Sequence, residues 1–297
     1  MTDIYRKLYT SSMMPSINLP KHYNYIGAFL SLSCNLSCSY CINHLVGLDQ
    51  RRKHLSGAEW VEGLNRIQTE GPLPISLQGG EPSIHKGFIE ILNGLRKDLN
   101  VDLLTNLQFD PHKFMDLVDP ERFKRDLPYP SIRVSYHPET MDLAETVNKV
   151  KILHDNGYSI GLFTVAHPDA LEYIPAAEQA CEENGILFKT KEFLGEHNGK
   201  LHGTYHYEGS VFSKEVKTVN CKTSELLISP EGHIYRCHHD LYNKITPVGH
   251  ILDPKFQIDD IFRECTYFGK CNPCDVKRKN NRFQNFGHCS VEIQDIE

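Results

Sequence analysis

The sequence predicts an α/β protein in which a parallel sheet is followed by a small cysteine-rich C-terminal region. Strand-like and helix-like segments alternate from about residue 25 to 195, and such alternation is typical of a parallel sheet covered by helices. Six strand–helix units are too few for a closed barrel of eight. They fit a partial, open (β/α)6 barrel, and a doubly wound sheet is the alternative that the alternation alone leaves open.

The six expected strands are short apolar runs, and several expected helices carry end signals. Ser56 and Glu59 form a capping box that predicts a helix from there through Thr69. Gly157 and Gly185 stand where left-handed residues end two later helices. We expect strands at residues 26–32, 74–77, 101–104, 132–135, 159–165 and 186–188. The other helices are expected at residues 88–99, 112–118, 143–156 and 171–184, from their apolar spacing.

Composition sets the class of protein and of partner. The chain has 297 residues, 40% hydrophobic and 24% charged, as in ordinary globular proteins. Its net charge of −6 disfavours a polyanion such as bulk nucleic acid as a partner. It contains no apolar run of roughly 18 residues and no signal-peptide pattern, so we expect a cytoplasmic protein with no membrane partner.

The ten cysteines are unevenly spread, which indicates metal ligands rather than disulfides in a reducing compartment. Cys34, Cys38 and Cys41 form a C-x3-C-x2-C cluster directly after the first expected strand. Three thiolates at this spacing can hold three corners of one iron–sulfur cluster and leave one iron open, whereas a closed structural site needs four ligands. The spacing therefore indicates chemistry more than scaffolding. Cys181 stands alone in a helical pattern and is expected to be a buried small hydrophobe.

This motif, with Tyr40 before its last cysteine, resembles that of radical S-adenosylmethionine (SAM) enzymes. The resemblance implies a TIM-like partial barrel and a [4Fe–4S] cluster on Cys34, Cys38 and Cys41, whose open iron is chelated by SAM. It also implies reductive cleavage of SAM to methionine and a 5′-deoxyadenosyl radical, which abstracts a hydrogen atom from the substrate. A flavodoxin- or ferredoxin-type protein would donate the electron.

A second motif supports the resemblance. Gly79, Gly80, Glu81 and Pro82 follow the second expected strand and resemble the Gly-Gly-Glu-Pro motif that binds the amino group of SAM in this family. Two glycines let a backbone approach a ligand closely, and Glu81 could accept a hydrogen bond from a cationic amine. A Gly-Gly pair alone indicates only a turn. Its position one strand–helix unit after the cysteine loop is what supports the resemblance to the family motif.

Polar residues at later strand ends are further candidates, because parallel sheets bind ligands at the carboxyl ends of their strands. Asn106 and Ser135 resemble family residues that touch the ribose or carboxylate of SAM. His137, His167 and Glu192 would face the same mouth and are weaker candidates for catalytic or substrate contact. Turn stabilisation is the alternative role for all five. A His-Pro pair replaces the acidic-Gly pair of the family after Ser135, which leaves the geometry of that loop open.

The C-terminal cysteines form a second pattern. Cys221 and Cys237 bracket a Pro-Glu-Gly turn with the spacing C-x10-G-x4-C, which resembles the auxiliary cluster domain called SPASM or, when shortened, twitch. The resemblance implies an auxiliary [4Fe–4S] cluster, for which the simplest ligand set is Cys221, Cys237, Cys271 and Cys274. Cys265 and Cys289 could replace members of that set or help to hold a second, incompletely liganded cluster. The chain departs from the full SPASM pattern, and a structural zinc site is the alternative, since spacing alone does not separate the two metals.

The expected organisation has four parts: an N-terminal extension at residues 1–24, the barrel at 25–200, a linker or cover at 201–220, and the auxiliary cluster domain at 221–297. The polar stretch around the linker carries His197, His202 and His206. The extension is too short for a peptide-recognition domain, which favours a small-molecule substrate.

Together these features predict a radical SAM enzyme whose auxiliary cluster accepts the electron left on a substrate radical, with oxidation or epimerisation of a small molecule as the result. A ribosomal-peptide or protein maturase of the same superfamily is the second interpretation. A non-catalytic iron–sulfur or zinc scaffold is the alternative of another class, and it would need no SAM.

Overall fold

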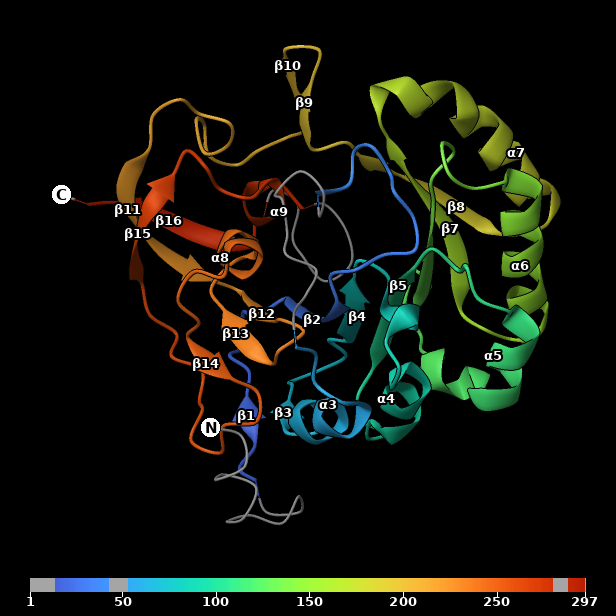
Figure 1. Ribbon diagram of the computed structural model, residues 1–297, viewed down its shortest axis with the longest axis horizontal. Helices are drawn as coiled ribbons and strands as arrows, with labels where there is room; N and C mark the ends of the chain where they lie inside the picture. The colour runs from blue at the N-terminus through green and yellow to red at the C-terminus, as the bar shows by residue number, and fades with distance from the viewer. Residues whose placement is uncertain (1–13, 43–52, 280–287, 297) are drawn as a thin grey trace.

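The computed structural model describes residues 14–42, 53–279 and 288–296, so part of the expected N-terminal extension lies outside the described residues. Its main sheet has nine strands in the order β14-β13-β12-β2-β4-β5-β6-β7-β8 (Figure 1). The six strands from β2 to β8 run parallel. All six expected strands are confirmed, at β2 (Tyr25–Ser31), β4 (Ile75–Gly79), β5 (Val101–Thr105), β6 (Ile132–Tyr136), β7 (Ile160–Ala166) and β8 (Leu187–Glu192).

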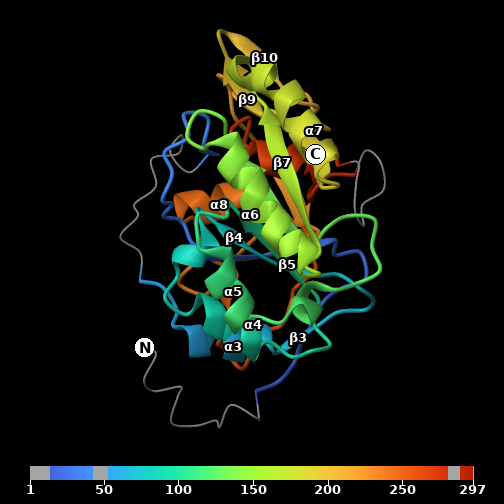
Figure 2. The ribbon, with the colours of Figure 1, turned by 90° about the vertical axis from the view of Figure 1, so that its right-hand side faces the viewer.

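The helices that connect these strands cover the outer face of the curved sheet (Figures 1 and 2). Between them and the sheet lies a large apolar core that includes Trp60, Ile91 and Val150. A doubly wound sheet would carry connecting helices on both faces, so the partial barrel is confirmed. The helices are α3 (Gly57–Leu64), α4 (Phe88–Gly94), α5 (Pro111–Leu117), α6 (Leu143–Asp155) and α7 (Ile174–Glu183), with 3-10 turns η2 (Pro82–Ile84), η3 (Pro120–Phe123) and η4 (Pro168–Tyr173).

Helix α3 shows where local signals define a helix and where they fail. The Ser56 hydroxyl accepts from Glu59 N at 3.3 Å and the Glu59 carboxylate accepts from Ser56 N at 2.8 Å, so the capping box is confirmed. The expected extension of this helix through Thr69 is wrong. Residues beyond the helix form β3 (Ile67–Gln68), which pairs in parallel with β1 (Ile17–Asn18), and this long-range pairing overrides the helical pattern.

The C-terminal region is joined to the barrel by sheet pairing. Strand β12 (Glu225–Ile228) runs parallel to β2, and β13 (His233–Tyr235) and β14 (Gly249–His250) continue the sheet in antiparallel fashion. Helix α8 (His238–Asn243) covers the second face of β2, where its Tyr242 packs against Phe29. Strand β2 is therefore buried on both faces, which explains why its sequence is a continuous apolar run.

The remaining C-terminal elements form a second small sheet in the order β15-β11-β16 (Figure 1). They are β11 (Lys217–Thr223), β15 (Arg263–Phe268), β16 (Val291–Asp295) and the short helix α9 (Pro273–Val276). A hairpin of β9 (Gly195–His197) and β10 (Lys200–His202) projects from the top of the view in Figure 1. In the described ranges, no helix combines the length and the hydropathy that a membrane crossing requires.

Candidate functional site

The three cysteines of the N-terminal motif lie on the loop that leaves the carboxyl end of β2. Cys38 is buried, and Cys34 and Cys41 are half-buried. Leu36 N donates to Cys34 Sγ at 3.4 Å, and Cys41 N donates to Cys38 O at 3.1 Å, so the loop is folded into turns. Burial raises the pKa of Cys34 and raises that of Cys38 to about 11. Burial thus favours the protonated thiol at Cys34 and Cys38, and a bound metal would hold these two side chains as thiolates.

The Gly-Gly-Glu-Pro turn at the end of β4 docks on this loop through its backbone. Gly80 N donates to Ser31 O at 2.7 Å, and Glu81 N donates to Ser33 O at 2.9 Å. Gly79 has a φ of 142°, and a Cβ on it would lie 1.8 Å from Ser31 O. A Cβ on Gly80 would lie 2.1 Å from Ser33 O. The two glycines are thus required by the close approach of the two loops, whatever ligand they also meet.

The carboxylate of Glu81 is buried and ties the end of β4 to the end of β5. Its Oε1 accepts from Thr105 Oγ1 at 2.7 Å and from Ser83 N at 3.0 Å, and its Oε2 accepts from Asn106 N at 2.7 Å. Burial raises the pKa of Glu81, and these hydrogen bonds act in the opposite direction. That this carboxylate also accepts from the amine of SAM remains a prediction.

Asn106 lies against the cysteine loop. Its Nδ2 donates to Asn35 Oδ1 at 2.8 Å and approaches Cys34 Sγ at 3.6 Å. Ser135 is half-buried on β6, one residue before the strand ends. Both residues therefore stand at the carboxyl ends of strands, as expected, and their contact with SAM remains a prediction.

Two of the three histidine and glutamate candidates converge on Tyr40. The Tyr40 hydroxyl hydrogen-bonds His137 Nδ1 at 2.8 Å, and the Tyr40 ring stacks on His167 with ring centres 4.9 Å apart. Burial lowers the pKa of His137 to about 4, and Lys191 contributes in the same direction, so the imidazole is neutral near pH 7. Glu192 is placed differently: its Oε1 accepts from Thr204 Oγ1 at 2.7 Å, in the segment that leads to the C-terminal region.

The loop after β6 closes on the cysteine loop, although its sequence departs from the family pattern. Glu139 Oε1 accepts from Ser39 N at 2.6 Å, and Thr140 Oγ1 lies 3.8 Å from Cys38 Sγ. Sequence reasoning missed Glu139 and Thr140, because neither belongs to a spacing pattern. The His-Pro pair before them was the one signal that this loop is unusual.

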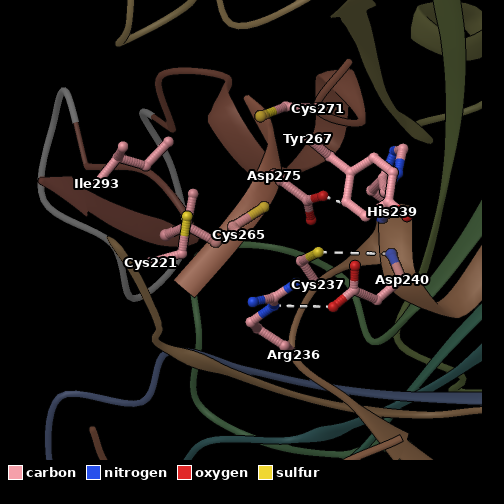
Figure 3. A pocket seen from close by; sticks show the side chains of 11 residues that line it. Cys221, Arg236, Cys237, His239, Asp240, Cys265, Tyr267, Cys271, Asp275 and Ile293 are labelled. Atoms are coloured by element: carbon pink, nitrogen blue, oxygen red, sulfur yellow. Dashed lines mark hydrogen bonds and ion pairs between the residues drawn. The ribbon is translucent and has the colours of Figure 1, made fainter. Parts of the chain in front are cut away.

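A cavity in the C-terminal region is lined by four thiols that come from four different places in the chain (Figure 3). Cys221 lies on β11, Cys237 caps α8, Cys265 lies on β15 and Cys271 precedes α9. Four convergent sulfur donors fit an iron–sulfur cluster, and they also fit zinc. Cys265 was expected only as a replacement ligand, and its position on a strand that pairs with β11 brings it here.

Burial and neighbouring groups shift the pKa values of the thiols in this cavity. A hydrogen bond from the Cys221 thiol lowers the pKa of Cys265, and the Arg236 guanidinium acts in the same direction. Arg236 itself is paired with Asp240, whose Oδ2 lies 2.8 Å from Arg236 Nε. Burial raises the pKa of Cys271 to about 12, so this thiol would lose its proton only to a metal.

The other two C-terminal cysteines are placed elsewhere. Cys274 and Cys289 are not among the residues that line this cavity. The Cys289 thiol donates to Val291 O at 2.7 Å. Burial raises the pKa of Cys274 and of Cys289.

Tyr242 connects the two cysteine regions and was missed by the sequence analysis. Burial raises the pKa of Tyr242 well above the usual value, and the neighbouring Cys274 and Cys41 act in the same direction. The same ring packs edge-on against Phe29 of β2. One buried tyrosine thus lies within electrostatic reach of cysteines from both ends of the chain.

Parts of the chain are similar to curated enzymes. It is 34% identical over 77 residues to the "Probable GTP 3′,8-cyclase" of Methanopyrus kandleri, an alignment of 26% of this chain and 24% of that protein. It is 36% identical over 74 residues to the PqqA peptide cyclase of Bradyrhizobium diazoefficiens, covering 25% of this chain and 18% of that protein. The chain therefore matches about a quarter or less of the length of these relatives. No family model matches it.

A solved structure shares the fold over most of the chain. The structure of anSMEcpe with bound AdoMet superimposes with a TM-score of 0.52 over 80% of this chain and 78% of that chain, at 16% sequence identity. At this identity the likeness concerns the fold, a partial barrel with a C-terminal extension.

Proposed function

We propose that the chain is a radical SAM enzyme, in line with the curated enzymes that parts of it resemble, and that it cleaves SAM reductively at a [4Fe–4S] cluster held by Cys34, Cys38 and Cys41. When bound, such a cluster supplies one electron through an iron that the protein leaves open to SAM. One observation supports this most: the three thiols share a single loop at the carboxyl end of β2. That loop contributes three cysteines and no fourth, which fits a cluster with an open iron.

The residues around the loop would hold SAM. The Gly-Gly-Glu-Pro turn brings its backbone against the cysteine loop and would bind the amino group of SAM there. Asn106, already in contact with the loop, and Ser135 at the end of β6 would bind the ribose or carboxylate. Tyr40 is fixed by His137 and by its stack on His167, so it would form a rigid wall beside the methionine end.

The test is formation of 5′-deoxyadenosine by the anaerobically reconstituted protein with SAM and dithionite. We expect the wild type to form it even without substrate, and we expect simultaneous Cys34→Ala, Cys38→Ala and Cys41→Ala to abolish it. Cys181→Ala is the matched control, because Cys181 is buried in α7, away from both cysteine regions. Cleavage retained in the triple variant would refute the proposal, and none in the wild type would favour a scaffold.

We also propose an auxiliary [4Fe–4S] cluster on Cys221, Cys237, Cys265 and Cys271, supported by their common cavity. It would accept the electron left on a substrate radical, so that the net reaction is an oxidation. A flavodoxin- or ferredoxin-type donor would reduce the first cluster.

Iron and sulfide analysis of the triple alanine variant tests this auxiliary site. Residual iron of roughly four per chain would establish one cubane cluster, and roughly eight would mean two. Zinc in place of iron would leave a structural site and remove the electron-acceptor role.

For the substrate, we propose a small molecule, in line with GTP in the name of the M. kandleri relative. A peptide is the second candidate, supported by the name of the PqqA peptide cyclase. Strand β8 also favours it, because it ends the nine-stranded sheet with mostly exposed residues, and a peptide can pair with such an edge. The test uses a deuterium-labelled peptide whose gene lies beside the gene of this protein. Transfer of deuterium from that peptide into 5′-deoxyadenosine would identify a peptide as the substrate.

A further inference from the structure

We propose that His167, Asp169 and His197 form a binding site for a divalent first-row transition metal ion, a site that uses none of the cysteines. One ligand atom of each residue lies within 4.8 Å of the others. His197 Nε2 lies 3.2 Å from Asp169 Oδ1, and His167 Nδ1 lies 3.9 Å from Asp169 Oδ2. Ligand atoms bonded to one such ion at about 2.1 Å lie roughly 3 to 3.5 Å from one another. A small movement of these side chains toward each other would therefore bring their ligand atoms to bonding positions around one ion.

The chemistry of the three side chains selects the class of ion. Two imidazoles and one carboxylate suit zinc, iron(II) and their neighbours in the first row, whereas calcium and magnesium prefer oxygen alone. Burial lowers the pKa of His167, which keeps this imidazole in the neutral form that binds metals. Three protein ligands leave coordination positions for water or for a group of the substrate.

The histidine rings are held in place by neighbours, as the ligands of a built site are. His167 stacks on Tyr40 and packs edge-on against Phe193, with ring centres 4.5 Å apart in the second contact. His197 packs edge-on against His167 at 4.8 Å. The side chain of His167 is 8% exposed and that of His197 is 19% exposed, while Asp169, at 72%, faces solvent and admits the ion.

The ligands come from two separate segments, which gives the ion a structural effect. His167 and Asp169 lie at the start of η4, directly after β7, whereas His197 ends β9 in the hairpin at residues 195–202. A bound ion would tie this hairpin to the barrel. Because Tyr40 of the cysteine motif touches His167, the tie would lie beside the candidate SAM site.

Two existing contacts would change on binding. His197 Nε2 lies 2.9 Å from Asn198 Nδ2, and His167 Nδ1 accepts a long hydrogen bond of 3.3 Å from Asp169 N. Asn198 is an exposed residue of the hairpin turn, so its amide can turn away at little cost. The bond to His167 Nδ1 is weak at this length.

A second histidine–carboxylate cluster differs from this site, because a lysine side chain already lies in it. Glu225, His238 and Asp275 also lie within 4.8 Å of one another, and all three are buried. The Lys279 ammonium already contacts Glu225, and His238 Nδ1 hydrogen-bonds Asp275 at 2.8 Å. In that cluster the Lys279 ammonium already provides a positive charge beside the carboxylates. At the proposed metal site the Asp169 carboxylate faces two imidazoles instead.

The test is zinc binding to the full-length protein with its iron–sulfur sites already loaded, measured by equilibrium dialysis and metal analysis. We expect roughly one zinc per chain at micromolar concentration, with iron unchanged. Asp169→Asn and His197→Ala should each weaken zinc binding by at least roughly 100-fold, since even loss of a residue behind a metal ligand costs 10- to 100-fold. Asp155→Asn is the matched control, an exposed aspartate beside the single histidine His154.

A second readout separates a real site from surface binding. Zinc should slow hydrogen exchange at residues 195–202 in the wild type and leave it unchanged in Asp169→Asn. Equal zinc affinity in the wild type and in Asp169→Asn would overturn the proposal. So would wild-type binding that appears only above about 1 mM, an affinity that any exposed carboxylate can supply.

Discussion

The carboxylate of Glu81 holds the end of β5 against the cysteine loop, and Glu81→Gln tests that role. Its two oxygens accept three hydrogen bonds from Thr105, Ser83 and Asn106. A glutamine oxygen can replace one carboxylate oxygen, and the amide NH2 then points at the donor that the other oxygen served. The best arrangement keeps the two bonds at Oε1 and turns the NH2 toward Asn106 N.

The cost follows from these contacts. One bond to a charged acceptor is lost, at about 1.5 to 3 kcal/mol, and a buried donor is left unsatisfied. The two remaining bonds become neutral and weaker. Because these effects overlap, we expect a decrease of about 3 kcal/mol in the free energy of unfolding of the metal-free protein.

Urea unfolding followed by tryptophan fluorescence measures this change. Trp60 is the single tryptophan and lies on the buried face of α3, 0% exposed, so its emission reports global unfolding. The control is Glu178→Gln, on the exposed side of α7, where a change within about 0.5 kcal/mol is expected. If Glu81→Gln unfolds at the wild-type urea midpoint while SAM binding is lost, the carboxylate serves SAM and not β5, and the reasoning fails.

Three further outcomes follow from the same structure. Burial lowers the pKa of His137 in the folded protein from 6.5 to about 4, so the stability that its neutral form contributes is present above pH 6.5 and is lost as the pH falls toward 4. In urea unfolding, His137→Gln should therefore lose less free energy of unfolding than the wild type over that pH window, by up to about 3 kcal/mol. Parallel pH curves for the two proteins would contradict this. Asp102 is buried between two arginines, and Asp102→Asn should cost about 3 to 5 kcal/mol in the same assay; a cost below about 1 kcal/mol would mean that the guanidinium groups reach water. In the background of the triple alanine variant, Cys265→Ala should remove the residual iron while Cys274→Ala retains it, and the reverse result would exchange the two ligands.

The fold was largely predictable because it rests on local patterns. The parallel strands are apolar runs that end in polar turns, and Gly157 and Gly185 have the positive φ of 86° and 65° expected at helix ends. The error after α3 has a physical cause of the opposite kind: the pairing of β3 with β1 joins distant segments, which no local window contains.

The residues of the candidate sites likewise fall into two groups, those that local sequence patterns predict and those that only the folded structure brings together. Cys34 and its partners are recognised by spacing within one loop, and the Gly-Gly-Glu-Pro turn by its order after that loop. The place of Cys265 in the C-terminal cavity depends on β15 pairing with β11, and that of Asp169 on a hairpin folding back over η4. Long-range contacts of this kind are not encoded in any local sequence pattern, so they could not be predicted from the sequence.

The pairing of β12 with β2 restricts which C-terminal regions could be exchanged between this protein and its relatives. The strand that carries the cysteine loop has β4 on one side and β12 on the other, so half of its edge bonding comes from beyond residue 220. A chimaera that grafts the C-terminal part of a relative onto this barrel would have to reproduce that register. A graft that does not would open a buried strand edge to self-association. The two cysteine regions are therefore expected to vary together as one inherited unit rather than as interchangeable modules.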